Sequence, residues 1–388
     1  MREHFESIVG IQAALDNPND LLAYSYDASG REGKARIVLF PSTEEHIRKI
    51  LTYANRTNIP VVPRGLGTNA LGQVVPENAI VIDMARFDRT HTVNLKEGWV
   101  HVDAGVVVSD LQHILEKHDY TLPVTPQSIT STTIGALLAT NQLDRRSHKN
   151  GRIKEHVLSI EIIDGTGKHF VDGNKEFIGM EGCGAIILRA KIQIYPRPKK
   201  LTSTQKTYDD VTSLLAAVDE YAQDLTVLSL EYINPTLAKG LGMQAKHTLL
   251  IEYASEKGEL VNEEQQQAIW DARARAWDVA AENGYPYIED CQATGEQLYD
   301  IISWCDEIDI PLAGHIGLGI LHPFFEKQEP QDFYHLLESI GAEASGQFGY
   351  GLVKKRYVSD HMKSKLIKLK DEYDYNDIIN RGKIHDYV

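Results

Sequence analysis

A glycine-rich loop directly after an apolar strand pattern is the feature that most constrains the fold of this chain. Residues 59–62 predict a strand, and it runs into Arg64-Gly65-Leu66-Gly67-Thr68-Asn69, with a further glycine at Gly72. Glycines permit positive φ and let backbone N–H groups approach a pyrophosphate closely. The stretch is neither a Rossmann GxGxxG nor a Walker A loop, because no GK[ST] follows and no βαβ helix begins there. By itself it fits a phosphate-binding loop and an ordinary tight turn about equally well.

Charge and cysteine content exclude several classes of protein. The chain of 388 residues has 40 Lys and Arg against 55 Asp and Glu, a net charge of −15. Such a surface repels phosphate backbones, so no nucleic-acid partner is expected. No apolar run approaches the ~20 residues of a membrane helix, and the polar start lacks a signal-peptide core, which predicts a cytoplasmic protein without a transmembrane segment. Cys183, Cys291 and Cys305 are too scattered for a disulfide framework or an iron–sulfur cluster, so an organic cofactor must carry any electrons.

Hydrophobic periodicity predicts an α+β protein whose two halves differ. In the first half, short strand patterns such as Val157–Asp164 alternate with a few helix patterns. Pro196-Arg197-Pro198 breaks this pattern, and beyond it longer helices alternate with strands that suit a helix-covered antiparallel sheet. We therefore expect domains at 1–198 and 199–359 and a C-terminal segment at 360–388. The clearest patterns of the second half are helices at 211–222, 262–283, 295–308 and 360–370 and strands at 227–233, 247–253 and 311–315.

Five later segments of the first half combine small residues with hydroxyl or amide side chains. They are Pro126-Gln127-Ser128, Thr133-Ile134-Gly135-Ala136, Ala139-Thr140-Asn141, Gly151 with His156-Val157, and Glu181-Gly182-Cys183-Gly184. Together with the glycine loop, their order and spacing resemble the FAD-binding domain of the vanillyl-alcohol oxidase superfamily, whose members are called PCMH-type flavoproteins. The resemblance extends over residues 36–195. It implies a two-subdomain domain that wraps FAD between its subdomains.

The resemblance also implies which residues bind the cofactor. The loop at 64–69 would hold the pyrophosphate, and the later segments would line the adenosine and the flavin. The loop has no histidine where covalently flavinylated members carry one, so we expect non-covalent FAD. Ala136 replaces a usual glycine, and 142–144 replace a usual glycine pair, which alters the rim of the site. The expected FAD-binding residues are Arg64, Gly65, Leu66, Gly67, Thr68, Asn69, Gly72, Pro126, Ser128, Thr133, Gly135, Ala136, Thr140, Asn141, Gly182 and Ile187.

Four segments of the second half carry a second resemblance. They are Ile269-Trp270-Asp271-Ala272-Arg273, the stretches 315–323 (HIGLGILHP) and 346–354 (GQFGYGLVK), and the ending Gly382-Lys383-Ile384. They are similar to the W-x-x-R helix, HxGDGNxHP, GEHGxGxxK and closing NPGKI of the branch that contains D-lactate dehydrogenase, the glycolate oxidase FAD subunit and D-2-hydroxyglutarate dehydrogenase. This resemblance implies an α+β substrate (cap) domain with an antiparallel sheet and a C-terminal segment that packs back on the FAD domain. It also implies flavin-mediated oxidation of a D-2-hydroxy acid.

Several polar residues of the branch are exchanged in these segments. In the branch an arginine orients the substrate carboxylate, a base takes the hydroxyl proton, and many members hold a divalent metal on two histidines and the glutamate of GEHG. Arg273, His315 and His322 are kept and are the expected catalytic residues, although a salt bridge for Arg273 or a structural histidine pair is an equally ordinary role. Gln347 stands in place of the glutamate, and Phe348 in place of the histidine base. Leu318, Ile320 and Ile288 replace further polar residues, so we expect no metal and leave the base open between the two histidines.

Three functions remain open from the sequence. The first is an FAD-dependent dehydrogenase or oxidase that acts on the CH–OH group of a small molecule, 2-hydroxy acids included. The second is a non-catalytic or electron-relay FAD subunit of a glycolate-oxidase-like complex. The third, an enolpyruvyl reductase of the same superfamily, is disfavoured by HIGLGILHP and GKI. The expected partners are a small-molecule substrate and an electron acceptor or iron–sulfur subunit, and a homodimer is left open.

Overall fold

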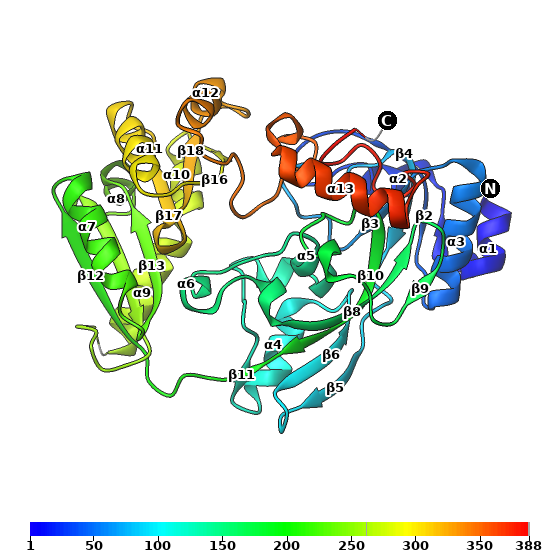
Figure 1. The fold of residues 1–388 in the computed structure, drawn as a ribbon, viewed down its shortest axis with the longest axis horizontal. Coiled ribbons are helices and arrows are strands. Elements are labelled where there is room, and N and C mark those ends of the chain that lie inside the picture. The colour runs from blue at the N-terminus through cyan, green and yellow to red at the C-terminus, as the bar shows by residue number, and fades with distance from the viewer. Residues whose placement is uncertain (261, 387–388) are drawn as a thin grey trace. The chain divides into compact units, whose positions relative to one another are not determined.

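The computed structural model describes residues 1–260 and 262–386, which form two compact units (Figure 1). Unit 1 contains residues 1–142, 152–197 and those from Phe348 onward, and unit 2 contains 143–151 and 198–347. The sequence placed the second boundary after residue 359, whereas residues from Phe348 cluster with unit 1. Neither unit is therefore one continuous stretch of chain. Among the described residues, no helix combines the length and apolar character needed to cross a bilayer.

The first sheet of unit 1 contains, in spatial order, β1 (Ala14–Leu15), β2 (Lys34–Leu39), β4 (Glu77–Asp83) and β3 (Val61–Arg64). β4 runs parallel to both of its neighbours. The helix α3 (Glu44–Thr57) begins at Thr43, whose hydroxyl accepts a hydrogen bond from the His46 N–H. α3 buries Ile47, Ile50, Leu51 and Ala54, the helical spacing that the sequence predicts. The other helices of this region are α1 (Arg2–Val9) and α2 (Pro18–Ala23).

The second sheet of unit 1 is antiparallel and has the order β5 (Thr90–Asn94), β6 (Trp99–Asp103), β10 (Ala185–Gln193), β8 (Val157–Asp164) and β9 (His169–Phe170). Buried apolar residues of both sheets form one core cluster, which also includes Leu366 and Ile379. The C-terminal segment is therefore part of the core of unit 1. The remaining elements of this unit are α4 (Val108–Glu116), β7 (Tyr120–Thr121), α5 (Ile134–Ala139), β11 (Tyr195–Pro196) and α13 (Asp360–Tyr373).

Unit 2 is built on one antiparallel sheet. Its order is β12 (Thr202–Tyr208), β14 (His247–Tyr253), β13 (Val227–Ile233), β17 (Leu312–His315), β18 (Ile320–Phe325) and β15 (Tyr287–Ile288), and β16 (Cys291–Gln292) also pairs with β18. The predicted α+β class with an antiparallel second sheet is confirmed. The helices of unit 2 are α6 (Ser147–Asn150), α7 (Val211–Ala222), α8 (Pro235–Gly240), α9 (Glu263–Ala274), α10 (Ala276–Glu282), α11 (Glu296–Glu307) and α12 (Gln331–Ile340).

Candidate functional site

The glycine loop follows directly on β3 and is shaped by its own arginine. Nη1 of Arg64 donates a hydrogen bond of 2.9 Å to the carbonyl oxygen of Tyr26. A Cβ atom built on Gly67 would lie 2.0 Å from Nη2 of Arg64, and Gly67 has a φ of 70°. Only glycine suits both this conformation and this close approach. Arg64 thus contacts the backbone of the loop to which it belongs.

The loop packs against the segment that leads into α5. The hydroxyl of Thr68 donates a hydrogen bond of 2.8 Å to the carbonyl oxygen of Ser131. A Cβ atom on Gly65 would lie 2.7 Å from Oγ1 of Thr133. Thr133 is also the N-cap of α5, because its hydroxyl accepts a hydrogen bond from the Ala136 N–H. Two stretches that the sequence assigns to FAD are therefore neighbours in unit 1.

Residues 181–184 lie beside the same loop. The Glu181 N–H donates to the carbonyl oxygen of Ala139 at the end of α5, at 2.7 Å. A Cβ atom on Gly182 would lie 3.3 Å from the ring of Pro63 in β3. Among the remaining expected residues, Leu66 is 45% exposed, whereas Pro126 and Ile187 of β10 are buried.

The other expected residues contact neighbouring parts of unit 1. The hydroxyl of Ser128 lies 2.9 Å from that of Thr132, and Gly135 lies close to Ala104. The hydroxyl of Thr140 donates to the carbonyl oxygen of Ala136, and the side chain of Asn141 accepts from the Lys154 N–H.

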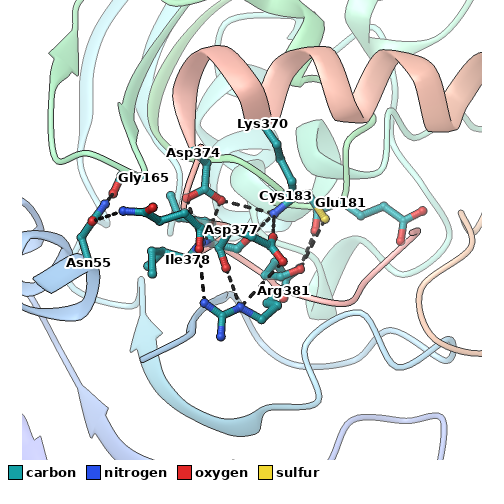
Figure 2. A network of polar contacts seen from close by, with 12 residues as sticks. Asn55, Gly165, Glu181, Cys183, Lys370, Asp374, Asp377, Ile378 and Arg381 are labelled. Atoms are coloured by element: carbon teal, nitrogen blue, oxygen red, sulfur yellow. Dashed lines mark hydrogen bonds and ion pairs between the residues drawn. The ribbon is translucent and has the colours of Figure 1, made fainter. Parts of the chain in front are cut away.

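Buried charges hold together the C-terminal segment of unit 1 (Figure 2). Nζ of Lys370 donates to Oδ2 of Asp374 at 3.2 Å, to the carboxylate of Asp377, and to the carbonyl oxygen of Ile379 at 3.0 Å. Asp374 in turn accepts hydrogen bonds from the N–H groups of Ile378 and Ile379. Burial raises the pKa of Asp374 to about 6, although the charge of Lys370 opposes the shift. The cluster is buried yet satisfied, the condition under which an ion pair persists in a core.

The same segment completes the surroundings of β3. The Val61 N–H donates to the carbonyl oxygen of Ile378, and the Asn380 N–H donates to the carbonyl oxygen of Val61, both at 2.8 Å. The carboxylate of Glu181 accepts hydrogen bonds from the Tyr350 and Gly351 N–H groups, at 2.7 and 2.8 Å. Beyond the loop, Asn69 accepts from the Leu71 N–H, and a Cβ atom on Gly72 would lie 3.1 Å from Cβ of Leu352. Sequence patterns did not predict that the side chains of Glu181 and Lys370 would bind the C-terminal part of the chain.

In unit 2, the expected catalytic residues meet at a buried carboxylate. Glu231 of β13 has a side chain that is only 1% exposed. Its Oε1 lies 2.6 Å from Nδ1 of His315, and its Oε2 lies 2.9 Å from Nη2 of Arg273. The ring of His322 meets that of His315 edge to face, with the centroids 5.4 Å apart. The sequence predicted His315, His322 and Arg273 but missed Glu231.

The protonation of this group follows from its burial and charges. Burial alone would raise the pKa of the Glu231 carboxyl, but the charges of His315 and Arg273 outweigh it and hold that pKa below its usual value. His322 is 4% exposed. Burial, and after it the neighbouring charge of His315, lowers the pKa of His322 well below its usual value. Glu231 is therefore ionised and His322 neutral near neutral pH.

Gln347 contacts this group from the exchanged GQFGYG stretch. Its Oε1 lies 3.2 Å from Nε2 of His315. The Gly346 and Gln347 N–H groups both donate to Oδ2 of Asp290, at 2.7 and 2.5 Å, which fixes the backbone there. The next residue, Phe348, belongs to unit 1, so the stretch is divided between the units. The other exchanged residues occupy β15 (Ile288), the turn after β17 (Leu318) and β18 (Ile320).

Two further arginines of unit 2 were not predicted. Arg146 donates to both carboxylate oxygens of Glu252 in β14, at 2.6 and 3.0 Å, and Arg145 donates to Oε1 at 3.0 Å. The guanidinium of Arg145 also lies over the Trp270 ring, 4.2 Å from its centroid. Both arginines directly follow residues 142–144, which take the place of the family's glycine pair. Their sequence context gave no sign of a carboxylate partner.

One group of possible metal ligands occurs among the described residues, and it lies in unit 1. Ligand atoms of Glu44, Glu161 and His169 are within 4.8 Å of one another. Nη1 of Arg189 lies 2.5 Å from Glu44 and 2.7 Å from Glu161, so a guanidinium already pairs with both carboxylates. We assign no metal to this group.

Comparison with known families identifies the chain. The model described as "FAD binding domain" matches residues 35–172, and the model described as "FAD linked oxidases, C-terminal domain" matches residues 243–384. The chain belongs to the FAD-linked oxidases. Its cofactor is FAD, as the sequence predicts, and the predicted resemblance to this family is confirmed.

The relatives of this FAD-linked oxidase fall in the predicted branch. The glycolate oxidase subunit GlcD of Bacillus subtilis (strain 168) is 26% identical, in an alignment that covers 99% of this chain and 96% of that protein. D-2-hydroxyglutarate dehydrogenase of Danio rerio is 24% identical over 87% of this chain and 75% of its own length. A solved alkyldihydroxyacetonephosphate synthase superposes with a TM-score of 0.68 at 15% identity and covers 95% of this chain and 83% of that one, which shows a shared fold.

The loop of this FAD-linked oxidase fits a dinucleotide. Gly65 and Gly67 permit close approaches that any side chain would block. Among the described residues, none accepts a backbone hydrogen bond from Gly65, Leu66 or Gly67. Unpaired N–H groups in a glycine loop are the donors that a pyrophosphate requires. The observed loop is thus compatible with the confirmed cofactor.

Proposed function

We propose that this FAD-linked oxidase oxidises the C–OH group of a small hydroxylated molecule and that His315 takes up the hydroxyl proton. The contact of 2.6 Å between Nδ1 of His315 and buried Glu231 carries the proposal. A carboxylate in this position holds the imidazole with its proton on Nδ1 and leaves Nε2 as the acceptor. Nε2 faces the side-chain amide of Gln347, which donates to it through its NH2 group once the amide is turned over, and which a substrate hydroxyl can replace.

His315 is favoured over His322 for this role. The pKa of His322 is depressed chiefly by burial, so His322 is a weak base near neutral pH. Phe348, at the position of the branch's usual base, has no group that accepts a proton. We therefore assign the base to His315 and a neutral, packing role to His322.

The proposed cofactor residues are the loop at 64–69 and its neighbours in unit 1. Thr68 and Thr133 have side chains at the contact of the loop with α5, and Gly182 lies beside β3. When bound, FAD supplies the acceptor for the two electrons and the hydrogen that leave the substrate carbon. We propose non-covalent binding, because no histidine occurs in the loop, and a site without a divalent metal, because amide oxygens such as that of Gln347 are poorer ligands than carboxylates.

Anaerobic spectroscopy of the purified protein tests the proposal. We expect a yellow protein whose FAD is released by denaturation and whose visible absorption bleaches with a hydroxylated substrate. D-lactate, D-2-hydroxyglutarate and glycolate are the first compounds to test because they are substrates named for its relatives or their branch. A protein that takes up no FAD would contradict the cofactor. FAD that is reduced only by dithionite would favour a non-catalytic or electron-relay subunit, and reduction by NADPH would favour an enolpyruvyl reductase.

An iron–sulfur partner is a proposal for the electron acceptor. GlcD is by its name a subunit, and the three cysteines of this chain are each buried and form no CxxC pair. A cluster would therefore reside in a separate subunit. Co-purification of the tagged protein with an iron-containing chain tests this, and rapid reoxidation of the reduced protein by O₂ alone would favour an oxidase instead.

A further inference from the structure

A row of polar side chains crosses one face of the unit 2 sheet. Glu252 of β14 pairs with Ser229 of β13, and Glu231 follows two positions later on the same strand. Paired residues and alternate residues of a strand project to the same face. The face therefore has two buried carboxylates, on Glu252 and Glu231, and His315 and Arg273 contact the second of them.

Each of these carboxylates already has its cations. Glu252 accepts three hydrogen bonds from Arg145 and Arg146, and Glu231 accepts from Arg273 and His315. Their side chains are 3% and 1% exposed. Removing one partner from a buried ion pair leaves an unpaired charge, which is far more costly than keeping the pair. A substrate anion must therefore compete with a carboxylate that is permanently in place.

The guanidinium of Arg273 offers little to such an anion. A carboxylate binds arginine most strongly in a bidentate manner, for instance through Nε and one Nη. Nη2 of Arg273 lies on Glu231, and Nε, although it has no hydrogen-bond partner among the described residues, is buried away from solvent. The positive charge of Arg273 is also balanced by the ionised carboxylate beside it.

We propose that Glu231 occupies the carboxylate position of Arg273, so that the site of unit 2 selects uncharged alcohols over 2-hydroxy acids. This inference rests on the proposed oxidation of a C–OH group and names its substrate class. It makes Glu231 a specificity-determining residue as well as the partner of His315. Arg273 then forms a permanent ion pair with Glu231 and does not orient a substrate carboxylate.

Arg145 and Arg146 are the competing anion site on this face. They share the carboxylate of Glu252, the carboxylate of Asp144 also acts on Arg146, and the side chain of Arg145 is 34% exposed. A 2-hydroxy acid bound by Arg145 would contradict the proposal as much as one bound by Arg273. The experiment therefore includes variants of both arginines.

Matched ligands test the proposal on the wild-type FAD-containing protein. D-lactate and (R)-propane-1,2-diol share a skeleton and differ in a carboxylate, as do glycolate and ethane-1,2-diol. We expect the diol of each pair to reduce the flavin faster, and we expect oxalate, titrated calorimetrically, to bind weakly. Faster reduction by either acid would overturn the proposal. If no alcohol reduces the flavin, the proposed function fails, and the oxalate titration still decides the charge argument.

Oxalate titration of variants locates the effect without turnover. Glu231→Gln removes the built-in carboxylate charge, and we expect oxalate to bind roughly tenfold to a hundredfold more tightly, the effect of a charge-assisted hydrogen-bond pair. Glu252→Gln leaves Arg273 paired but frees Arg145 and Arg146, so tighter oxalate binding in this variant reports on the competing site alone. Oxalate that binds Glu231→Gln no better than wild type would contradict the proposal. So would tight binding to wild type that is lost in Arg273→Leu or in Arg145→Leu, a result that stands even if Glu231→Gln does not fold.

Discussion

The glycine loop of unit 1 and the polar face of unit 2 differ in how far they depart from the sequence pattern of their family. The loop keeps its family pattern, and Gly67 is held to glycine by both its φ of 70° and its approach to Arg64. The face of unit 2 keeps the sheet and His315 but has Gln347 and, in the next unit, Phe348 where its branch has a glutamate and a histidine. Dinucleotide binding relies on backbone geometry, whereas the reaction relies on single side chains. The cofactor is therefore much better determined than the substrate.

The largest expected effect is on the reaction and follows from His315. In His315→Ala the rate of flavin reduction by the best wild-type alcohol should fall by about 10²–10⁴-fold, the usual contribution of a general base. His322→Ala should cost much less, because the depressed pKa of that imidazole makes it a weak base. Stopped-flow bleaching of the flavin measures both. Equal losses in the two variants would remove the distinction between the histidines.

A large loss of stability is expected at the C-terminal segment. Lys370→Met leaves Asp374 and Asp377 without their buried cation, and breaking such a pair costs about 3–5 kcal/mol of the free energy of unfolding. Lys363→Met changes a lysine of the same helix that pairs only with an exposed aspartate, so it should change stability by less than about 1 kcal/mol. Urea unfolding of the two variants tests this. Similar midpoints would mean that the buried cluster contributes little.

A more moderate effect is expected at the loop. Gly67→Ala places a methyl group against Arg64 and forces a positive φ on alanine, so the dissociation constant for FAD should rise roughly tenfold or more. Gly242→Ala is the matched control, since Gly242 has a φ of 74° but no heavy atom within 4 Å of its Cβ position. Equilibrium dialysis of FAD measures both. Unchanged FAD binding in Gly67→Ala would separate the loop from the cofactor.

A gain of metal binding is expected when two residues of the branch are restored in the exchanged stretch. Gln347→Glu places a carboxylate at the position that now faces Nε2 of His315, and combined with Phe348→His it returns two groups of the branch. Zn²⁺ should bind this double variant at least about tenfold more tightly than wild type, because carboxylates and imidazoles are better ligands than an amide. Metal analysis after dialysis checks this. Unchanged metal content would show that the remaining apolar exchanges, such as Leu318, also exclude the ion.

A pH dependence of stability is expected from Asp374. Its pKa is raised from 3.8 to about 6 in the folded state, so the folded state binds the proton more tightly than the unfolded state. The resulting stabilisation is complete below about pH 4 and is lost as the pH rises through about 6. Relative to Asp374→Asn, the wild type should therefore lose stability over this range. Thermal unfolding of both proteins between pH 4 and 7 measures the difference, and parallel curves would contradict it.

Much of the fold followed from local patterns. The helix at 211–222 and the strands at 227–233 and 247–253 have the bounds that the periodicity predicts. The helix predicted at 262–283 is divided at Arg275 into α9 and α10. Strand β18 was not predicted, because HIGLGILHP has no alternation of apolar and polar residues. Local sequence thus gives element types more reliably than element ends.

The candidate site was only half predictable. His315 and Arg273 carried a family pattern, but their partner Glu231 lies in an apolar strand pattern without any motif. Its pairing depends on which strands are neighbours in the sheet, and 84 positions separate it from His315. The same holds for Arg146 and Glu252, which are 106 positions apart. Tertiary structure determines which charged residues pair in this way, and no short sequence pattern predicts such pairs.

The pairing of Val61 with residues 378–380 has a consequence for the order of synthesis. The strand that leads into the glycine loop is made early, but its neighbour on the far side is translated only after all of unit 2. On the ribosome, the substrate unit is therefore complete before the flavin unit can close. A nascent chain should accordingly bind FAD weakly until its last residues emerge, and the cofactor then stabilises a chain that has already folded elsewhere.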